Sequence, residues 1–381
     1  MALLLIIYIS FISLGLPDGV LGSAWPVMHS QLSLPLWSAG LISATVSIGT
    51  VVSSLASARV VGRFGTGKVT FFSVLMTALA LVGYSFAPNL AVLLLFAIPL
   101  GLGAGSVDAA LNNYVALHYK ARHMSWLHSF WGIGASAGPA IIALVFSLGY
   151  SYKVGYRLIG SVQTLLVVLL FFSLHLWKDQ LSADRNGKTQ GNKKALSIKG
   201  VPFALLTFFL YCSLEGSTGL WATSYLVRVK QVPVAQAALW GSLYYLGITV
   251  GRIFSGFITF RVSNNKMIMG GLAFCAASIA LFFSANPNVA GFALLMLGLG
   301  SAPIYPCMIH ETPRRFGVES SQAVIGLQMA SAYMGSTCMP PLMGILAGTI
   351  GLFWMPFVQA FLILGMILSV LYLMHLTNKK A

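Results

Sequence analysis

The stretch LAVLLLFAIPLGLGAGSVDAALNNYVA, residues 90–116, decides how the rest of the chain is interpreted. It is long enough to cross a bilayer core as a helix, which takes about 20 apolar residues, and its one charged residue is Asp108. A transmembrane barrel strand is shorter, about 9–11 residues, and alternates apolar with polar side chains. The stretch therefore predicts an α-helical membrane span.

The whole chain has the composition of this stretch. Of its 381 residues, 57% are apolar and only 8% are charged, against roughly 25% charged residues in a soluble domain. Too few charges are present to cover a soluble globule, and the chain is too apolar for a disordered protein. We predict an all-α integral membrane protein with twelve transmembrane helices at residues 3–28, 37–58, 68–86, 90–116, 124–148, 154–177, 201–227, 236–259, 266–284, 289–310, 321–348 and 352–375.

The charge is strongly positive, +15, from 22 Lys and Arg against 7 Asp and Glu. With a cytoplasmic N-terminus, most of the basic residues fall on connections at the cytoplasmic side, as the positive-inside rule requires. The charge thus indicates orientation rather than a nucleic-acid partner. We expect a multi-pass protein of the plasma membrane with both termini cytoplasmic. The four cysteines lie within spans and lack metal-site or disulfide spacing, so no metal and no cofactor is expected.

A hydrophilic stretch from Lys178 to Gly200 divides the predicted spans into six and six. It predicts three parts: an N-terminal six-helix half at 1–177, a basic cytoplasmic linker at 178–200, and a C-terminal six-helix half at 201–381. A flexible, charged loop is a natural linker between two membrane halves.

The two halves are related in sequence. The motif Asp18-Gly19-x-x-Gly22 recurs 197 residues later as Glu215-Gly216-x-x-Gly219, and Leu100-Gly101-Leu102-Gly103 recurs at the same offset as Leu297-Gly298-Leu299-Gly300. Gln163 and Gln359 are related by an offset of 196. Parallel repeats of this kind place a substrate site near the bilayer midplane, between the halves.

This layout resembles the major facilitator superfamily. The loop GRFGTGK, residues 62–68, is similar to the cytoplasmic signature loop of that superfamily, although it lacks the usual acidic residue. Residues 107–113 (VDAALNN), 127–134 (LHSFWGIG), 215–221 (EGSTGLW) and 246–252 (LGITVGR) resemble the fucose/glucose–proton symporter branch. The resemblance implies two pseudo-symmetric six-helix halves that alternate access. It also implies proton coupling and sugar binding at Asp108 and Asn112, whereas Glu215 has no clear counterpart in the fucose symporters.

Three of the seven acids, Asp18, Asp108 and Glu215, lie inside predicted spans. A charge at a helix centre costs about 2.5–3.5 kcal/mol even on the milder scale. A buried carboxyl group can take up a proton and release it when its exposure changes, so all three are candidate proton-coupling residues. Each has a structural alternative, in which the acid stabilises a helix kink or pairs with a buried Arg.

Spacing adds detail to these candidates. Asp108 and Asn112 are four residues apart and share a helix face, where a carboxylate and an amide can hold a hydroxylated ligand. Pro17-Asp18-Gly19 predicts a break in the first span, a usual pointer to a binding site in carriers. The equivalent Glu215-Gly216 predicts a flexible point without the proline.

Aromatic and amide side chains in the cavity-lining spans are further candidates for substrate binding, because sugars stack on rings and need polar partners for their hydroxyls. The alternative for each is packing or an interfacial position. The candidates are Trp131, Trp221, Tyr225, Tyr244, Tyr245, Gln328, Gln163 and Gln359. Candidates for gating or structural roles at the cytoplasmic ends are Arg63, Lys68, Arg252, Glu311 and His128.

These features predict a secondary active transporter that moves a small polar solute, a sugar, together with protons. No ATPase or hydrolase motif is present, so an enzyme is not expected. One alternative is a proton-driven exporter or flippase of amphipathic compounds or lipids, which the 15 Met and 24 Phe would suit. Another is a non-transporting membrane receptor or scaffold. The expected partners are the solute, protons and the lipid bilayer, and the protein is expected to be a monomer.

Overall fold

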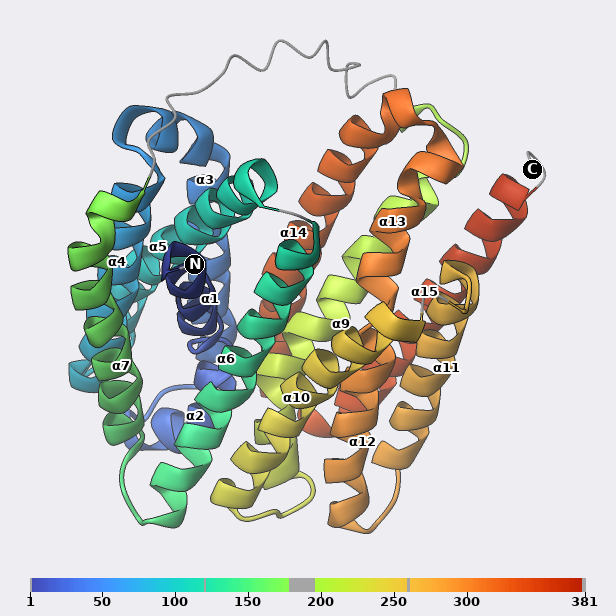
Figure 1. The fold of residues 1–381 in the computed structure, drawn as a ribbon. Helices are drawn as coiled ribbons and strands as arrows, with labels where there is room; N and C mark the ends of the chain where they lie inside the picture. The colour runs from blue at the N-terminus through green and yellow to red at the C-terminus, as the bar shows by residue number, and fades with distance from the viewer. Residues whose placement is uncertain (1, 120, 178–195, 259–260, 379–381) are drawn as a thin grey trace. The chain divides into compact units, whose positions relative to one another are not determined.

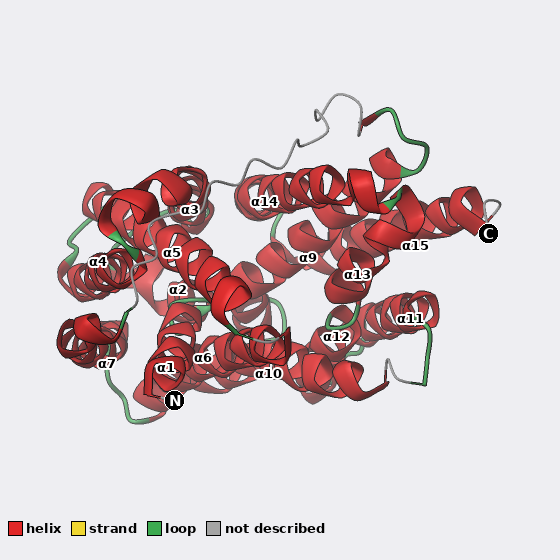
Figure 2. Ribbon diagram, turned by 45° about the horizontal axis from the view of Figure 1, so that its top comes forward, coloured by secondary structure: helices red, strands yellow, loops and turns green. Residues whose placement is uncertain are grey.

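The computed structural model describes residues 2–119, 121–177, 196–258 and 261–378. Within these ranges the chain forms helices, turns and loops, and contains no strand (Figure 2). The all-α prediction is therefore confirmed for the described part of the chain. Most of the predicted linker, residues 178–195, lies outside it.

The helices follow one another along the chain, and their connections are short except for that between α7 and α9 (Figure 1). They are α1 (Ala2–Gly15), α2 (Val20–Gln31), α3 (Ser38–Phe64), α4 (Thr66–Phe86), α5 (Leu90–His118), α6 (Ala121–Ser147), α7 (Tyr152–Ser173), α9 (Val201–Arg228), α10 (Val234–Ile258), α11 (Asn264–Phe282), α12 (Pro287–Ser301), α13 (Ile304–Phe316), α14 (Val318–Thr349) and α15 (Met355–Asn378).

Most of the predicted spans meet a hydropathy criterion as well as a length criterion. Among the described residues, ten segments are both long and apolar enough to cross a membrane. The other two predicted spans form α10 and α14, which have 25 and 32 residues and are long enough to cross. The chain is a multi-pass membrane protein.

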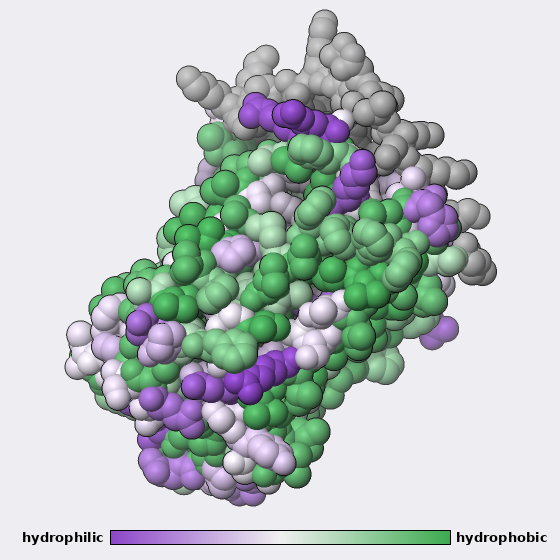
Figure 3. Space-filling model, turned by 90° about the vertical axis from the view of Figure 1, so that its left-hand side faces the viewer, coloured by the Kyte–Doolittle hydropathy of each residue, from purple (hydrophilic) through white to green (hydrophobic). Residues whose placement is uncertain are grey.

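One face of α7 shows the surface that such a protein presents to lipid. Leu158, Val162, Leu165, Leu169 and Phe172 are exposed, with Leu165 at 71% and Phe172 at 70%. Their spacing of three and four places them on one side of the helix. Figure 3 views the side of the molecule on which α4 and α7 lie. Hydrophobic residues cover most of this side, and hydrophilic residues gather toward its ends.

The chain groups into two compact units. One holds Met1–Arg185 and Val232–Ser242, and the other holds Asn186–Gln231 and Leu243–Ala381. The first turns of α10 therefore group with the N-terminal helices. The predicted part boundaries at 177 and 200 remain a prediction.

The same helix pairs pack together within each unit, as the sequence repeat predicts. In the first unit α1 packs on α6, α3 on α5, and α4 on both α5 and α7. In the second unit α9 packs on α14, and α11 packs on both α12 and α15. Contacts between the glycines of α10 and α12 complete the correspondence with α3 and α5.

The repeated glycines explain how these helices approach so closely. A Cβ atom on Gly101 of α5 would overlap the carbonyl oxygen of Val46 of α3, and one on Gly298 of α12 would overlap the carbonyl oxygen of Tyr244 of α10. Only glycine permits this contact, and small residues at helix interfaces are typical of membrane proteins. The repeat in sequence is thus a repeat of backbone-to-backbone packing.

Helix breaks distinguish the two units. The predicted break in the first span is confirmed: α1 ends at Gly15, α2 begins at Val20, and Gly19 has a left-handed φ of 73°. By contrast, α9 continues through Glu215-Gly216 without interruption, because Gly216 retains the N–H that a proline would remove. The tenth predicted span divides into α12 and α13 around Ala302 and Pro303, which the sequence analysis did not predict.

Candidate functional site

Asp108 and Asn112 form the simplest of the intramembrane polar groups. The Asn112 Nδ2 donates to the Asp108 Oδ1 at 2.8 Å and to the Asp108 backbone oxygen at 3.0 Å. Both side chains are half-buried on α5. Among the described residues, no cation lies within 4.0 Å of the Asp108 carboxylate. The Asp108 carboxyl group is thus held by a neutral amide and has no basic neighbour at ion-pair distance.

Asp18 and Trp131, which the sequence analysis proposed for different roles, lie together. The Trp131 Nε1 of α6 donates to the Asp18 Oδ2 at 2.8 Å. Asp18 stands in the break between α1 and α2, where its backbone N–H is bonded to the Gly15 oxygen at 2.9 Å. This geometry matches the structural alternative for Asp18, an acid that stabilises a helix break, and it orients the indole of Trp131.

Glu215 belongs to a different kind of polar group, in which a base is present. Within the second unit Glu215 and Tyr211 of α9 interact electrostatically with each other and with Arg252 of α10. Tyr211 lies one turn before Glu215, so the two share a helix face. Glu215 and Arg252 are both half-buried, and Tyr211 is fully buried.

Two further tyrosines interact with this charge pair. Tyr305, at the start of α13, interacts with Arg252 and Glu215, and its ring centroid is 5.7 Å from that of Tyr211. Tyr244 of α10 interacts with Glu215 and is 1% exposed, and its hydroxyl has no hydrogen-bond partner among the described residues. We call Tyr211, Glu215, Tyr244, Arg252 and Tyr305 the charge-pair cluster.

Three other aromatic candidates are packed inside the second unit. Trp221 is fully buried, and its Nε1 donates to the Pro340 oxygen of α14 at 2.8 Å. The Tyr225 hydroxyl donates to the Phe282 oxygen at 3.4 Å. The Tyr245 hydroxyl lies against Gly219, where a Cβ atom would overlap it. Each ring therefore has a structural role here, and its role in substrate binding remains a prediction.

The three glutamines are buried within their own units. Gln163 of α7 donates to the Ser13 oxygen of α1 at 2.8 Å and accepts from the Thr77 hydroxyl of α4 at 2.6 Å. Gln359 of α15 donates to the Thr218 hydroxyl at 2.9 Å, and Gln328 of α14 accepts from the Thr312 hydroxyl at 3.1 Å. These bonds connect helices, so the proposed contacts of the glutamines with substrate also remain predictions.

The gating candidates of the first unit lie at helix ends. Arg63 and Lys68 are exposed on either side of Gly65, which separates α3 from α4 with a φ of 81°. The Arg63 guanidinium is 5.4 Å from the centre of the Phe64 ring. His128 of α6 meets Phe11 edge-on at 6.0 Å. A role for these residues in gating remains a prediction.

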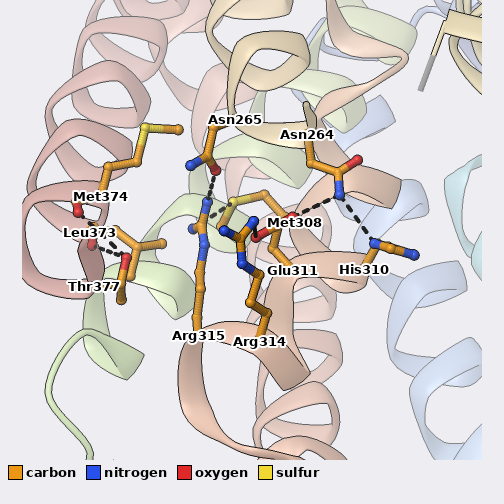
Figure 4. A network of polar contacts seen from close by, with 10 residues as sticks. All are labelled: Asn264, Asn265, Met308, His310, Glu311, Arg314, Arg315, Leu373, Met374 and Thr377. Carbon is orange, nitrogen blue, oxygen red and sulfur yellow. Dashed lines mark hydrogen bonds and ion pairs between the residues drawn. The ribbon is translucent and has the colours of Figure 1, made fainter. Parts of the chain in front are cut away.

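Glu311 lies in a network between the start of α11 and the end of α13 (Figure 4). It accepts from the Asn264 Nδ2 at 2.8 Å and faces Arg314 at 3.7 Å. Beside it, the Arg315 NH2 donates to the Asn265 Oδ1 at 2.6 Å. Basic residues in the last turn of α13 also favour its negative helix end. The network joins two helices that are distant in sequence.

Sequence reasoning missed Tyr211 and Tyr305. Two signals were available for them. Tyr211 precedes the intramembrane acid Glu215 by four residues, and Tyr305 stands 197 residues after Asp108, at its repeat position. In the second unit a tyrosine, Tyr305, thus stands at the position equivalent to the acid Asp108. Glu215 is the equivalent of Asp18, and it interacts with Arg252, a base.

Comparisons with known proteins agree with this architecture. A family model described as Major Facilitator Superfamily matches residues 7–319 and 203–381. Bypass of stop codon protein 6 of Saccharomyces cerevisiae is 24% identical over 388 residues, covering 91% of this chain and 77% of its own. Membrane protein MosC of Rhizobium meliloti is 28% identical over 298 residues, covering 76% of this chain and 70% of its own.

Two further proteins match this chain: one relative whose name states its substrate, and one protein of known structure. The glucose/mannose transporter GlcP of Bacillus subtilis is 24% identical over 227 residues, covering 56% of this chain and 55% of its own. The crystal structure of the nucleoside transporter NupG has a TM-score of 0.77 at 14% identity, covering 97% of this chain and 98% of its own. At that identity the structure supports the fold alone.

Proposed function

Because the chain belongs to the Major Facilitator Superfamily, and is therefore a transporter rather than an enzyme, we propose that it is a proton-coupled symporter of a small polar solute, a sugar. In this proposal the protein lies in the plasma membrane with both termini cytoplasmic. It works as a monomer, and its two halves alternate access to a site near the midplane.

The Asp108–Asn112 pair is the observation that carries the proposal. A carboxylate in the membrane interior is costly without a compensating charge, and in the described residues Asp108 has a neutral amide for a partner. A proton neutralises such a group at little structural cost, because the Asn112 amide can remain in place. The proton can leave again when the site opens to water at the other side of the membrane.

The same pair supports a hydroxylated solute. An amide both donates and accepts, and a carboxyl group accepts when ionised and donates when protonated. The two therefore offer different hydrogen bonds to a sugar hydroxyl in the two protonation states, which links solute binding to proton binding. The similarity to a glucose/mannose transporter also supports a sugar.

Uptake into right-side-out vesicles tests the proposal. Vesicles that contain the protein should accumulate a radiolabelled hexose when a proton gradient is imposed, and a protonophore should abolish the accumulation while equilibration continues. A panel of hexoses and nucleosides identifies the solute class. Accumulation that persists with the protonophore would contradict proton coupling, and absence of uptake for every hexose would contradict the sugar assignment.

A further inference from the structure

We infer that the charge-pair cluster is a second solute-contact site, built to bind neutral hydroxylated solutes and to exclude anionic and cationic ones. The inference rests on the proposed function, which concerns Asp108 and the sugar, and deepens it. It assigns solute specificity to Glu215 and Arg252 and adds Tyr211 and Tyr305 to the contact residues, among which Tyr244 is already a candidate.

The first step concerns charge. Glu215 and Arg252 are opposite charges on two helices of one unit, and both are half-buried and interact electrostatically. For a buried ion pair, the cost of removing both charges from water often exceeds the attraction between them. Apolar side chains of similar size often give equal or greater stability. Together the two opposite charges leave the region neutral overall.

The second step concerns hydrogen bonds. Tyr211, Tyr244 and Tyr305 interact electrostatically with one or both members of the pair, and the Tyr305 hydroxyl also donates to the Met329 sulfur at 2.9 Å. The Tyr244 hydroxyl is fully buried and has no hydrogen-bond partner among the described residues. A buried hydroxyl without a hydrogen bond is unfavourable, so a ligand that supplies the missing hydrogen bond is favoured there. A polyhydroxylated ring offers several donors and acceptors.

The third step is specificity. A neutral solute leaves the balance between Glu215 and Arg252 unchanged. An anionic solute brings a second negative charge close to Glu215, and a cationic solute brings a second positive charge close to Arg252. Like charges in a desolvated site are strongly unfavourable, and natural sites use this repulsion to reject the wrong ligand. The pair therefore excludes charged analogues of the same shape.

Charge-neutralising variants test this directly with three probes of nearly equal shape: D-glucose, D-glucuronate and D-glucosamine. Glu215→Gln leaves Arg252 without its counter-charge, and a solute carboxylate can then supply it. Glu215→Gln should raise the ratio of glucuronate to glucose uptake by about tenfold or more. Arg252→Gln should raise the ratio of protonated glucosamine uptake to glucose uptake by a similar factor.

Two controls separate a specific site from a general effect of charge. In the double variant Glu215→Gln, Arg252→Gln the cluster again has no net charge. The uptake of both charged probes relative to glucose should therefore fall back toward that of the unsubstituted protein. Glu311→Gln removes another buried acid of the same unit, one that lies with Asn264 and Arg314 at a helix end, and should not change the ratio. Unchanged ratios in both single variants, or an equal change in Glu311→Gln, would overturn the inference.

Ligand-dependent stabilisation of the purified proteins keeps this test separate from the proposed function. If the unsubstituted protein takes up glucose and neither single variant changes selectivity, the sugar symporter stands and the cluster has no role in specificity. If the unsubstituted protein takes up no hexose, the proposed function fails. In that case, stabilisation of the Glu215→Gln protein by glucuronate supports charge selection by the cluster, and no stabilisation overturns the inference. If Glu215→Gln does not fold, Arg252→Gln with glucosamine is the test, and if Arg252→Gln does not fold, Glu215→Gln with glucuronate is the test.

Discussion

Trp131 of α6 donates its indole N–H to a carboxylate oxygen of Asp18 across 2.8 Å, and it thereby joins α6 to the break between α1 and α2. By sequence alone, the acid is a candidate for proton coupling and the indole is a candidate for sugar stacking. The structure makes them partners. A hydrogen bond to a charged group is worth about 1.5–3 kcal/mol, so the bond contributes to holding the broken span in its conformation.

Removing this bond should lower stability. In Trp131→Phe a ring remains but the donor is lost, so we expect the free energy of unfolding to fall by about 1–3 kcal/mol. The measurement is the thermal midpoint of the purified protein in detergent. Trp126→Phe is the matched control, because Trp126 lies on the same helix and is 50% exposed. Equal midpoints for the two variants would show that the bond to Asp18 contributes nothing.

Replacing Asp108 should separate accumulation from exchange. Asp108→Asn keeps a hydrogen-bonding side chain beside Asn112 and removes the proton-binding group. We expect loss of uphill uptake and partial retention of solute exchange across vesicles loaded with unlabelled solute. Asn113→Ala, at an exposed position on the same helix, is the control and should accumulate normally. An Asp108→Asn protein that still concentrates solute would refute the assigned role of Asp108.

Two adjacent glycines of α11 should respond oppositely to alanine. A Cβ atom at Gly270 meets nothing within 4 Å, whereas one at Gly271 meets the Gly300 backbone oxygen of α12 at 2.5 Å. Gly270→Ala should stabilise by about 0.4–1 kcal/mol by restricting the unfolded chain. Gly271→Ala should destabilise by about 1–3 kcal/mol through overpacking. Denaturation midpoints of the pair check this, and a stabilised Gly271→Ala would contradict the close packing of α11 on α12.

Gln163 and Gln359 stand at repeat-related positions but are satisfied to different degrees. Gln163 makes bonds to α1 and α4, whereas Gln359 bonds Thr218, and its Oε1 has no partner among the described residues. Gln163→Met should therefore cost more stability than Gln359→Met, by about 1 kcal/mol for the additional bond. Thermal midpoints of the two variants are the measurement. The reverse order would show that the buried bonds of Gln163 are not important for stability.

The class of the protein and the outline of its fold could be predicted from the sequence because they depend on local composition. The run from Leu90 to Ala116 predicts a membrane helix, and α5 spans Leu90–His118. The break at Pro17–Gly19 was equally predictable, since a proline and a glycine act on their own backbone. The division of the tenth span at Ala302 and Pro303 was missed, although its proline was visible.

The sequence by itself determined the helical membrane architecture, the internal repeat and the acids available for proton chemistry. It did so because span length, hydropathy and the 197-residue offset are properties of the chain read in order. The spacing also placed the Asn112 amide beside Asp108, because both lie on one helix face. Only the tertiary structure decided the partners that come from other helices: an indole for Asp18, and an arginine with tyrosines for Glu215. Whether a buried carboxyl group is neutralised by a proton or by a base depends on side chains from other helices, and their positions follow from packing rather than from local sequence.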